Sequence, residues 1–338
     1  MKTFTTLTIL IILVLVFANF MILNQDEDQP KTSFYAKSLH ATNRGIGFLY
    51  SKEQGGLERI TGKSAREVGC YQSKCHASSC DDCHQKTTDG GSIYTSDTAT
   101  LYNACVKCHG DMAKENHDVH FSKGMKCLDC HTPAEIHGDG REHNTFNEPG
   151  FFSARCEKCH KDLSKSESHT AHNGKVDCIA CHDESQTTCL NCHVETRMAK
   201  GKQASVPLRN MTFLVNHDGK VTTANMLSYV YRNNTMITFA KTFNHSIKKA
   251  GRKCEECHNS QISKELKNNT LKLVWWNNDS LHNVKGVIPV LEGFDWNLVF
   301  LDKENGKWRP LTNPAKPLLN YSGYCSPITR DQLNKLAN

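Results

Sequence analysis

The cysteines and histidines of this sequence recur together at a fixed spacing. The 338 residues contain 17 cysteines and 18 histidines, so chance would place a histidine directly after a cysteine about once. The chain instead has eight such dipeptides. Seven of them end a Cys-x-x-Cys-His motif, namely Cys80/Cys83-His84, Cys105/Cys108-His109, Cys127/Cys130-His131, Cys156/Cys159-His160, Cys178/Cys181-His182, Cys189/Cys192-His193 and Cys254/Cys257-His258. Such an excess indicates that these residues act together as ligands.

The spacing within each motif suits the covalent attachment of haem. Two thiols three residues apart can reach the two vinyl groups of one haem and form thioethers, and the next histidine then becomes the proximal ligand of the iron. Zinc would also use Cys-x-x-Cys pairs, but it needs a second pair or two spaced histidines and gives no reason for an immediate histidine. A disulfide framework leaves the histidines equally unexplained. We therefore expect haem c at the seven regular motifs, with the iron bound by His84, His109, His131, His160, His182, His193 and His258.

The eighth motif is wider, with four residues between Cys70 and Cys75-His76. Its insert must bulge out if both sulfurs are to reach the vinyl groups, and the chain then carries eight haems, with His76 as the eighth proximal ligand. Alternatively, Cys70 forms a disulfide with Cys325, Cys75 is a single thioether or a free thiol, and the haems number seven. In the first case Cys325 has no local partner, and we expect it to be a buried or free thiol.

With these motifs the chain resembles the multihaem c-type cytochromes, most of all the low-potential tetrahaem and octahaem members that carry electrons in anaerobic respiration. The resemblance extends from Cys70 to His258, more than half of the chain. It implies haem c as the cofactor. Because that family includes widened motifs, it also supports a total of eight haems. It does not indicate a substrate or a redox partner.

An internal repeat points to the second axial ligands. Cys105, Cys127 and Cys130 each have a counterpart 51 residues later, and the two histidine pairs between the motifs are 52 residues apart. The repeat favours four of the ten remaining histidines as distal ligands, namely His117, His120, His169 and His172. Because positions i and i+3 share one face of a helix, each pair could serve two haems.

Four further histidines near the motifs complete a set of eight distal candidates, namely His40, His137, His143 and His245. His282 could replace any of them. His217 lies in the sequence Asn-His-Asp-Gly, which is typical of a hairpin turn. We therefore expect His217 to be a solvated turn residue and not a ligand.

The elements that must position these residues change in character along the chain. Hydrophobic residues make up 38% of it, below the ~45–50% of a typical soluble domain, and they show little periodicity between residues 70 and 193. We expect this stretch to be mostly irregular, with short α-helices around a haem core, and a short helix over 57–67 to lead into it. After residue 200, apolar strands and the turn signals Asp218-Gly219 and Asn233-Asn234 predict a β-rich C-terminal region.

Four segments follow from this pattern. Residues 1–24 form a hydrophobic run that is suited to a signal peptide or an N-terminal membrane anchor, and 25–69 form an N-terminal segment. Residues 70–200 are expected to hold seven haems in a two-haem repeat of about 51 residues, and 201–338 form the β-rich region with one haem. The hydrophobic run predicts export to the periplasmic or extracellular side, with the protein either secreted or anchored to the cytoplasmic membrane.

Three functions are consistent with the motifs. Histidines on both sides of every iron leave no place for a substrate, which predicts an electron carrier and not an enzyme, working with donor and acceptor cytochromes or a quinol oxidase module. One open iron would instead give a reductase of a small nitrogen or sulfur oxyanion, although no Cys-x-x-Cys-Lys motif occurs. The β-rich region could also mediate a homo-oligomer or an extracellular conducting filament. The net charge of +6 is too small to indicate a nucleic-acid partner.

Overall fold

The computed structural model of the protein describes residues 34–42, 44–70, 79–109, 118–164, 166–184, 186–201, 204–304 and 306–337. The predicted signal peptide or anchor over 1–24 lies outside the described residues. Three of the predicted haem-binding residues, Cys75, His76 and His117, also lie outside them. Within the described part, no helix has the length and hydrophobicity needed to cross a bilayer.

Short helices and turns make up the first half of the described chain. It begins with α2 (Phe34–Lys37), α3 (Arg44–Tyr50), the 3-10 turn η1 (Lys52–Gln54) and α4 (Glu58–Thr61). The next stretch contains α5 (Asp81–His84), β1 (Gln85–Thr88), β2 (Gly91–Tyr94), α6 (Ser96–Ala99), α7 (Tyr102–His109), η4 (Phe121–Lys123), η5 (Cys127–Asp129), α8 (Pro133–His137), η6 (Cys156–Lys158), α9 (Glu167–Thr170) and α10 (Cys178–His182). The helix predicted over 57–67 is only four residues long, because Gly62 ends it in the left-handed conformation.

A six-stranded sheet dominates the second half of the chain. Its order is β13-β6-β5-β3-β4-β9, and its strands are β3 (Gln186–His193), β4 (Val206–His217), β5 (Lys220–Tyr231), β6 (Asn234–Lys241), β9 (Gly286–Pro289) and β13 (Leu318–Ser322). The hairpin predicted at Asp218-Gly219 is confirmed as β4–β5. The one predicted at Asn233-Asn234 is present as β5–β6, but its turn residues are Arg232 and Asn233, and Asn234 begins β6. β4 and β5 pair directly only near their turn. Further along they separate, and β3 lies between them, antiparallel to β4 and parallel to β5.

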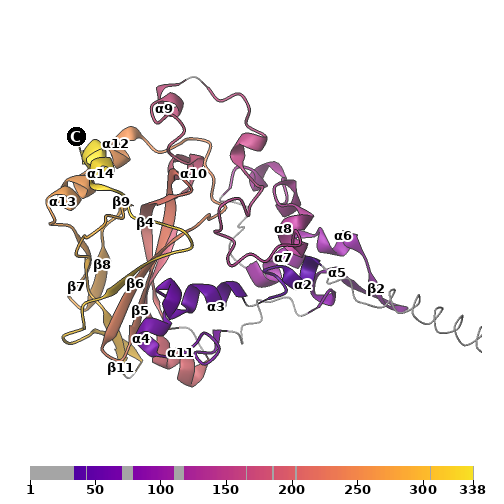
Figure 1. Cartoon of the computed structure of the whole chain (residues 1–338), viewed down its shortest axis with the longest axis horizontal. Helices are drawn as coiled ribbons and strands as arrows, with labels where there is room; N and C mark the ends of the chain where they lie inside the picture. Colours follow the sequence, from indigo (N-terminus) through magenta and orange to yellow (C-terminus); the bar gives the residue numbers. More distant parts are fainter. Residues whose placement is uncertain are drawn as a thin grey trace, which may run out of the picture.

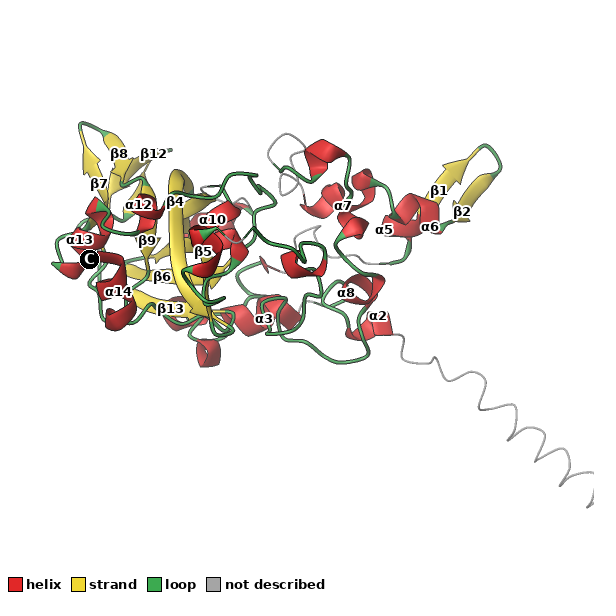
Figure 2. Cartoon of the chain, turned by 90° about the horizontal axis from the view of Figure 1, so that it is seen from above, coloured by secondary structure: helices red, strands yellow, loops and turns green. Residues whose placement is uncertain are grey.

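Smaller elements surround this sheet. They are α11 (Val194–Lys200), α12 (Cys254–Cys257), α13 (Gln261–Lys267), α14 (Arg330–Ala337), a three-stranded sheet of β10 (Asn297–Leu298), β7 (Lys272–Asn277) and β8 (Ser280–Asn283), and a hairpin of β11 (Leu301–Glu304) and β12 (Lys307–Pro310). Figures 1 and 2 show the large sheet at one end of the molecule and α5–α8, with the β1–β2 hairpin, at the other.

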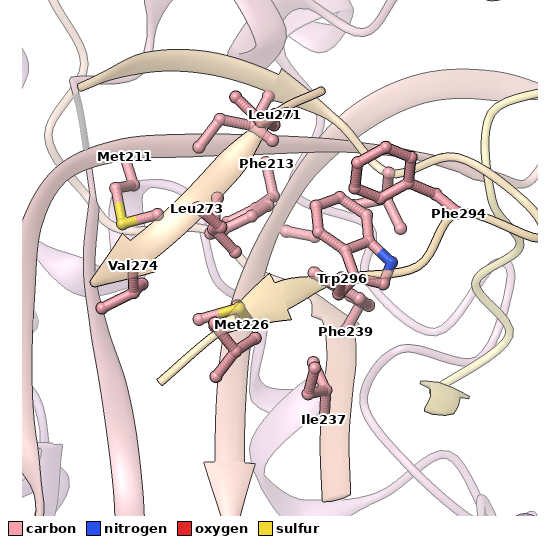
Figure 3. Close-up of a cluster of buried hydrophobic side chains, with 14 of the residues drawn as sticks. Met211, Phe213, Met226, Ile237, Phe239, Leu271, Leu273, Val274, Phe294 and Trp296 are labelled. Atoms are coloured by element: carbon pink, nitrogen blue, oxygen red, sulfur yellow. The ribbon is translucent and has the colours of Figure 1, made fainter. Parts of the chain in front are cut away.

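The main hydrophobic core packs against the large sheet. Apolar residues alternate along β4, β5 and β6, so they project from one face of the sheet. There they meet apolar residues from β7 and from the loop that precedes β10, as Figure 3 shows for Met211, Phe213, Met226, Ile237, Phe239, Leu273 and Trp296. A second cluster joins the segment around α4 to β5 and β6 through Ile60, Val68 and Tyr229.

The region that carries most of the motifs has much less hydrophobic core. Between residues 79 and 182, the buried hydrophobic residues among those described are Ile179 and Ala180. The sheet region, in contrast, buries large side chains such as Phe213 and Phe239 almost completely. Aliphatic and aromatic packing therefore accounts for the sheet region but not for the motif region.

Candidate haem sites

Six of the seven regular motifs form a single helical turn, in α5, at the end of α7, and in η5, η6, α10 and α12. In four of these turns the backbone N–H of the histidine donates to the carbonyl of the first cysteine. The distance from the backbone nitrogen of the histidine to the carbonyl oxygen is 2.7 Å at His258 and 2.9 Å at His84, His131 and His160. Positions i, i+3 and i+4 of a helix share one face. One turn therefore brings both sulfurs and the imidazole to the same side.

Acidic residues inside the motifs help to explain why the turns form. In three motifs the residue before the second cysteine is acidic, namely Asp82, Asp129 and Glu256. Its carboxylate accepts a hydrogen bond from the backbone N–H of the residue that precedes the first cysteine, at 3.4, 2.7 and 2.8 Å respectively. The start of a helix leaves such N–H groups without an intrahelical partner. The carboxylate supplies one, as the acidic residue of a capping box does.

Each of these six motif histidines faces a second histidine from another part of the chain. The ring centres of the six pairs are 6.0–6.2 Å apart, in His84–His137, His109–His40, His131–His245, His160–His120, His182–His169 and His258–His172. All six partners are among the eight distal candidates of the sequence. The structure thus brings the predicted proximal and distal residues together at six places.

The separation of the rings fits an iron between them. An imidazole nitrogen lies about 2.0–2.1 Å from a bound metal, and the ring centre lies about 1.1 Å behind that nitrogen. Two imidazoles on opposite sides of one iron should therefore have centres about 6.2–6.4 Å apart. Burial, together with the nearby His131 ring, lowers the pKa of His245 to about 4. This ring is uncharged at neutral pH, as a metal-binding imidazole must be.

Hydrogen bonds that the ring nitrogen Nδ1 donates orient several of the motif histidines. His84, His182 and His258 donate from Nδ1 to backbone carbonyls at 3.2, 3.0 and 3.1 Å, those of Thr95, Lys248 and Lys335 respectively. Such a bond fixes the direction of the ring and leaves Nε2 for the metal.

At two other paired rings, Nδ1 donates to a buried carboxylate instead of a backbone carbonyl. Glu135 accepts a hydrogen bond from Nδ1 of His131 at 2.9 Å, and Asp118 accepts one from Nδ1 of His120 at 3.0 Å. Burial raises the pKa of Glu135, but hydrogen bonds from Ser153 and His131 outweigh this effect and hold the pKa below its usual value. Neither carboxylate is among the residues predicted from the sequence. For Glu135 a signal exists, because it follows a threonine by three residues as in a capping box.

The six turns lie next to one another in space in the order of the sequence. The thiol of Cys83 is close enough to that of Cys108 to interact electrostatically, and the same is true of Cys105 with Cys127, Cys130 with Cys159, Cys156 with Cys178, and Cys181 with Cys254. The row begins at α5, beside the β1–β2 hairpin, and ends at α12, which contacts β9 of the sheet (Figure 1).

The motif at Cys189 has a different geometry. It lies in the extended strand β3, between β4 and β5, and not in a helical turn. Nε2 of His193 donates to Asp302 at 2.7 Å, and Nδ1 accepts a hydrogen bond from the backbone N–H of Thr196. As placed, these residues do not fit a haem, because Nε2 is already engaged and no second histidine of the described residues pairs with His193.

Cys70 is buried in the cluster that joins the segment around α4 to the sheet, near the thiol of Cys192. Cys325 packs against the main core instead, where its sulfur accepts a hydrogen bond from the backbone N–H of Lys241 at 3.1 Å. The alternative disulfide between Cys70 and Cys325 is therefore wrong, and no disulfide joins any two of the described cysteines. Cys75 and His76, the rest of the widened motif, lie outside the described residues.

His143 and His282 lie apart from the six ring pairs. His143 is buried between two carboxylates, and its nitrogens are 3.2 and 3.3 Å from oxygens of Asp139 and Glu148. His282 stacks on Trp275 of the neighbouring strand. Six of the eight distal candidates thus face a motif histidine in the structure. His143 does not face one, and His117 lies outside the described residues.

The prediction that His217 is solvated is wrong. Its ring stands at the end of β4, directly before the turn, but the residue is only 6% exposed. Nε2 donates to the backbone carbonyl of Asn147 at 2.7 Å. A contact between residues 70 positions apart buries this ring, and the local turn sequence cannot show it.

Three curated proteins are similar to parts of the chain. It is 31% identical over 136 residues to the cytochrome c-type protein NrfB of Escherichia coli, a match that covers 31% of this chain and 72% of NrfB. It is 26% identical over 139 residues to the multihaem cytochrome MtrA of Shewanella baltica, covering 32% of this chain and 42% of MtrA. It is 26% identical over 99 residues to the dissimilatory sulfite reductase MccA of Wolinella succinogenes, covering 25% of this chain and 14% of MccA.

The chain therefore spans less than half of MtrA and of MccA, but nearly three quarters of NrfB. No protein-family model and no solved structure matches it. The similarity to two cytochromes agrees with the repeated Cys-x-x-Cys-His turns and with the spacing of the paired rings, and it identifies haem c as the cofactor. The chain belongs to the multihaem c-type cytochromes.

Proposed function

We propose that the protein is an electron carrier whose six histidine pairs hold a row of haems. The observation that carries the proposal is the second histidine opposite each of six motif histidines, with ring centres 6.0–6.2 Å apart. Imidazoles on both sides of the metal leave no position for a substrate. When bound, a c-type haem supplies an iron that alternates between the ferric and ferrous states.

The protein residues at each site have separate roles in this proposal. The paired thiols would attach the cofactor, and the motif histidine and the second histidine would both bind its iron. The bonds from Nδ1 to carbonyls or carboxylates keep the rings in position. Because each motif lies beside the next, the six sites form a continuous series.

The total number of haems is a separate part of the proposal. The six paired sites account for six haems, and the sequence predicts two more, at Cys70 and at Cys189. Loading of the Cys189 motif would require β3 to leave its extended conformation, so that both thiols and His193 face one side. An intact mass of the purified protein counts the haems, because each adds roughly 616 Da.

Electron paramagnetic resonance of the oxidised protein tests the carrier function. We expect at least six haems by mass and a low-spin ferric signal that accounts for six irons. Cyanide, nitric oxide and carbon monoxide should leave those six irons unchanged. The proposal would be contradicted by a high-spin ferric signal from more than two haems, the number that the Cys70 and Cys189 motifs could hold. Fewer than six haems by mass would also contradict it.

We also propose that the protein works on the periplasmic or extracellular side, with donor and acceptor cytochromes or a quinol oxidase module as partners. Support comes from the similarity to the cytochromes NrfB and MtrA. Protease treatment of intact cells and of spheroplasts tests the location. Protection in both preparations would contradict it.

A further inference from the structure

Two of the six histidine pairs differ from three of the others in the group behind the ring. Three motif histidines donate from Nδ1 to neutral backbone carbonyls. His131 and His120 donate instead to the carboxylates of Glu135 and Asp118, which are only 8% and 4% exposed. Among the paired rings of the described chain, these two have a carboxylate partner.

Four donors surround the side chain of Glu135. Oε2 accepts hydrogen bonds from Nδ1 of His131 and from the backbone N–H of Thr132, at 2.9 and 3.2 Å. Oε1 accepts from the backbone N–H groups of Ser153 and Ala154. Each donor directs a hydrogen at an oxygen, and hydrogen bonds of this kind favour the ionised carboxylate.

Asp118 is held in a similar way and links two neighbouring sites. Oδ1 accepts from the ring and from the backbone N–H of His120, at 3.0 and 2.7 Å. Oδ2 accepts from the backbone N–H of Ile247 at 3.0 Å. Ile247 follows His245, the partner of His131, by two residues. The two carboxylates therefore serve adjacent pairs, the third and fourth of the six.

A carboxylate behind an axial imidazole makes that ring a stronger donor to the metal. A stronger donor stabilises ferric iron more than ferrous iron, because the ferric ion carries the greater positive charge. Hydrogen bonding to the axial ligands is one of the means by which a protein sets the reduction potential of a haem. A buried carboxylate should thus lower the potential, whereas a carbonyl has a smaller effect.

We infer that Glu135 and Asp118 are positioning residues that lower the reduction potentials of the irons at the His131–His245 and His160–His120 pairs. The inference rests on the proposed electron-carrier function. It implies that the two middle sites of the row are harder to reduce than the three sites at which Nδ1 of the motif histidine donates to a carbonyl. In a partly reduced protein the electrons therefore occupy the two ends of the row.

The test is a redox titration of the whole haem-loaded protein, followed by visible absorption and electron paramagnetic resonance. Glu135→Gln keeps the size of the side chain and an acceptor oxygen but removes the charge. One haem per chain should then titrate at a higher potential, by at least a tenfold change in its ferric-to-ferrous ratio, or about 59 mV for one electron. Asp118→Asn should shift a second haem in the same direction. The control is Glu142→Gln, at an exposed residue paired with Arg44, which should leave the titration unchanged.

The inference would be overturned if the wild type, Glu135→Gln and Asp118→Asn gave superimposable titrations with six low-spin irons in each. The proposed carrier function would then remain intact. An equal shift in Glu142→Gln would also overturn it, because the effect would then be one of overall charge. If Glu135→Gln loses haem or does not fold, the Asp118→Asn titration decides alone. A wild-type protein without six low-spin irons would be a failure of the proposed function instead.

Discussion

His245, which we propose as a second axial ligand, shows how the fold prepares a single ring for metal binding. Its ring centre lies 6.1 Å from that of His131, and the ring also contacts Phe121 and Phe243. Its backbone has φ of 48°, an uncommon conformation for a residue other than glycine. Burial and the His131 ring hold it neutral at neutral pH by lowering its pKa to about 4. The ring can therefore bind a metal without first losing a proton.

Replacement of His245 by alanine should open one iron. We expect His245→Ala to keep the same number of haems by mass, because the thioethers are unaffected. One iron per chain should become high-spin and bind carbon monoxide in the ferrous state. His282→Ala is the matched control, since His282 stacks on Trp275 and faces no motif histidine. A high-spin iron additional to those of the wild type in both variants, or in neither, would contradict the role of His245 as an axial ligand.

Cys325 allows a prediction for pH dependence. Burial raises the pKa of its thiol to about 11, against about 8.5 for an ordinary cysteine. At pH 8 only about one molecule in a thousand then carries the reactive thiolate. Alkylation by iodoacetamide in the native protein should be about 200-fold slower than in guanidinium, and its rate should rise about tenfold per pH unit up to about pH 10. Equal rates at pH 8 in the native and unfolded protein, measured by peptide mass, would contradict this.

At the scale of elements, the sequence supports inferences that depend on neighbouring residues. Asp218-Gly219 identifies the β4–β5 turn because both residues must adopt positive φ, observed at 49° and 72°. A motif such as the one at Cys127 contains its own acidic residue, Asp129, which caps the turn. The internal repeat likewise singled out His120, His169 and His172, each of which lies opposite a motif histidine.

The sequence could not show what depends on distant contacts. The Cys189 motif has the same spacing as the other six, yet it is a strand, because β4 and β5 hydrogen-bond to it from both sides. The role of the carboxylates behind the rings could not be predicted either, because only the folded chain places Asp118 beside the N–H of Ile247. His217 is buried for the same kind of reason, since its partner Asn147 is remote in the sequence.

The turn between β4 and β5 provides a test at this scale. Gly219 has φ of +72°, and a methyl group on its Cα would meet open space, so only backbone strain opposes a side chain there. We expect Gly219→Ala to destabilise the sheet by about 1–2 kcal/mol. Gly90→Ala is the control, because Gly90 has equal space and no positive φ, and alanine should be neutral or slightly stabilising. Guanidinium unfolding followed by far-ultraviolet circular dichroism measures both, and equal midpoints would contradict the prediction.

On the scale of the whole molecule, the two ends differ in what holds them together. The sheet region buries Phe213, Phe239 and Trp296 in a continuous core. Residues 79–182 bury almost no hydrophobic side chains among those described. Burial of apolar surface stabilises by about 25 cal/mol per Å², so the motif region needs another source of buried surface. In a c-type cytochrome the porphyrins supply it.

Omission of haem should therefore affect one end of the molecule first. When the chain is produced without haem attachment, we expect limited proteolysis to cut within 79–182 and to spare the sheet from β4 to β13. The haem-loaded protein should resist cleavage throughout the same region at the same protease concentration. Cleavage sites are read by mass spectrometry. If the haem-free chain were cut equally in the sheet, the main core would not be stable without the cofactor.

The net charge changes with the cofactor as well. The polypeptide alone carries +6, with a pI of about 8.5. A c-type haem with two histidine ligands adds about −1 in the ferric state and about −2 in the ferrous state, from the porphyrin, the iron and two propionates. Six haems bring the net charge of the protein to about 0 when oxidised and about −6 when reduced, and eight haems bring it to about −2 and about −10.

Native isoelectric focusing should therefore place the oxidised protein well below pH 8.5, and dithionite should move it further toward the anode by one charge per haem. A protein that focuses at or above 8.5, or that does not move on reduction, would show that the excess of lysine and arginine does not serve to offset propionates.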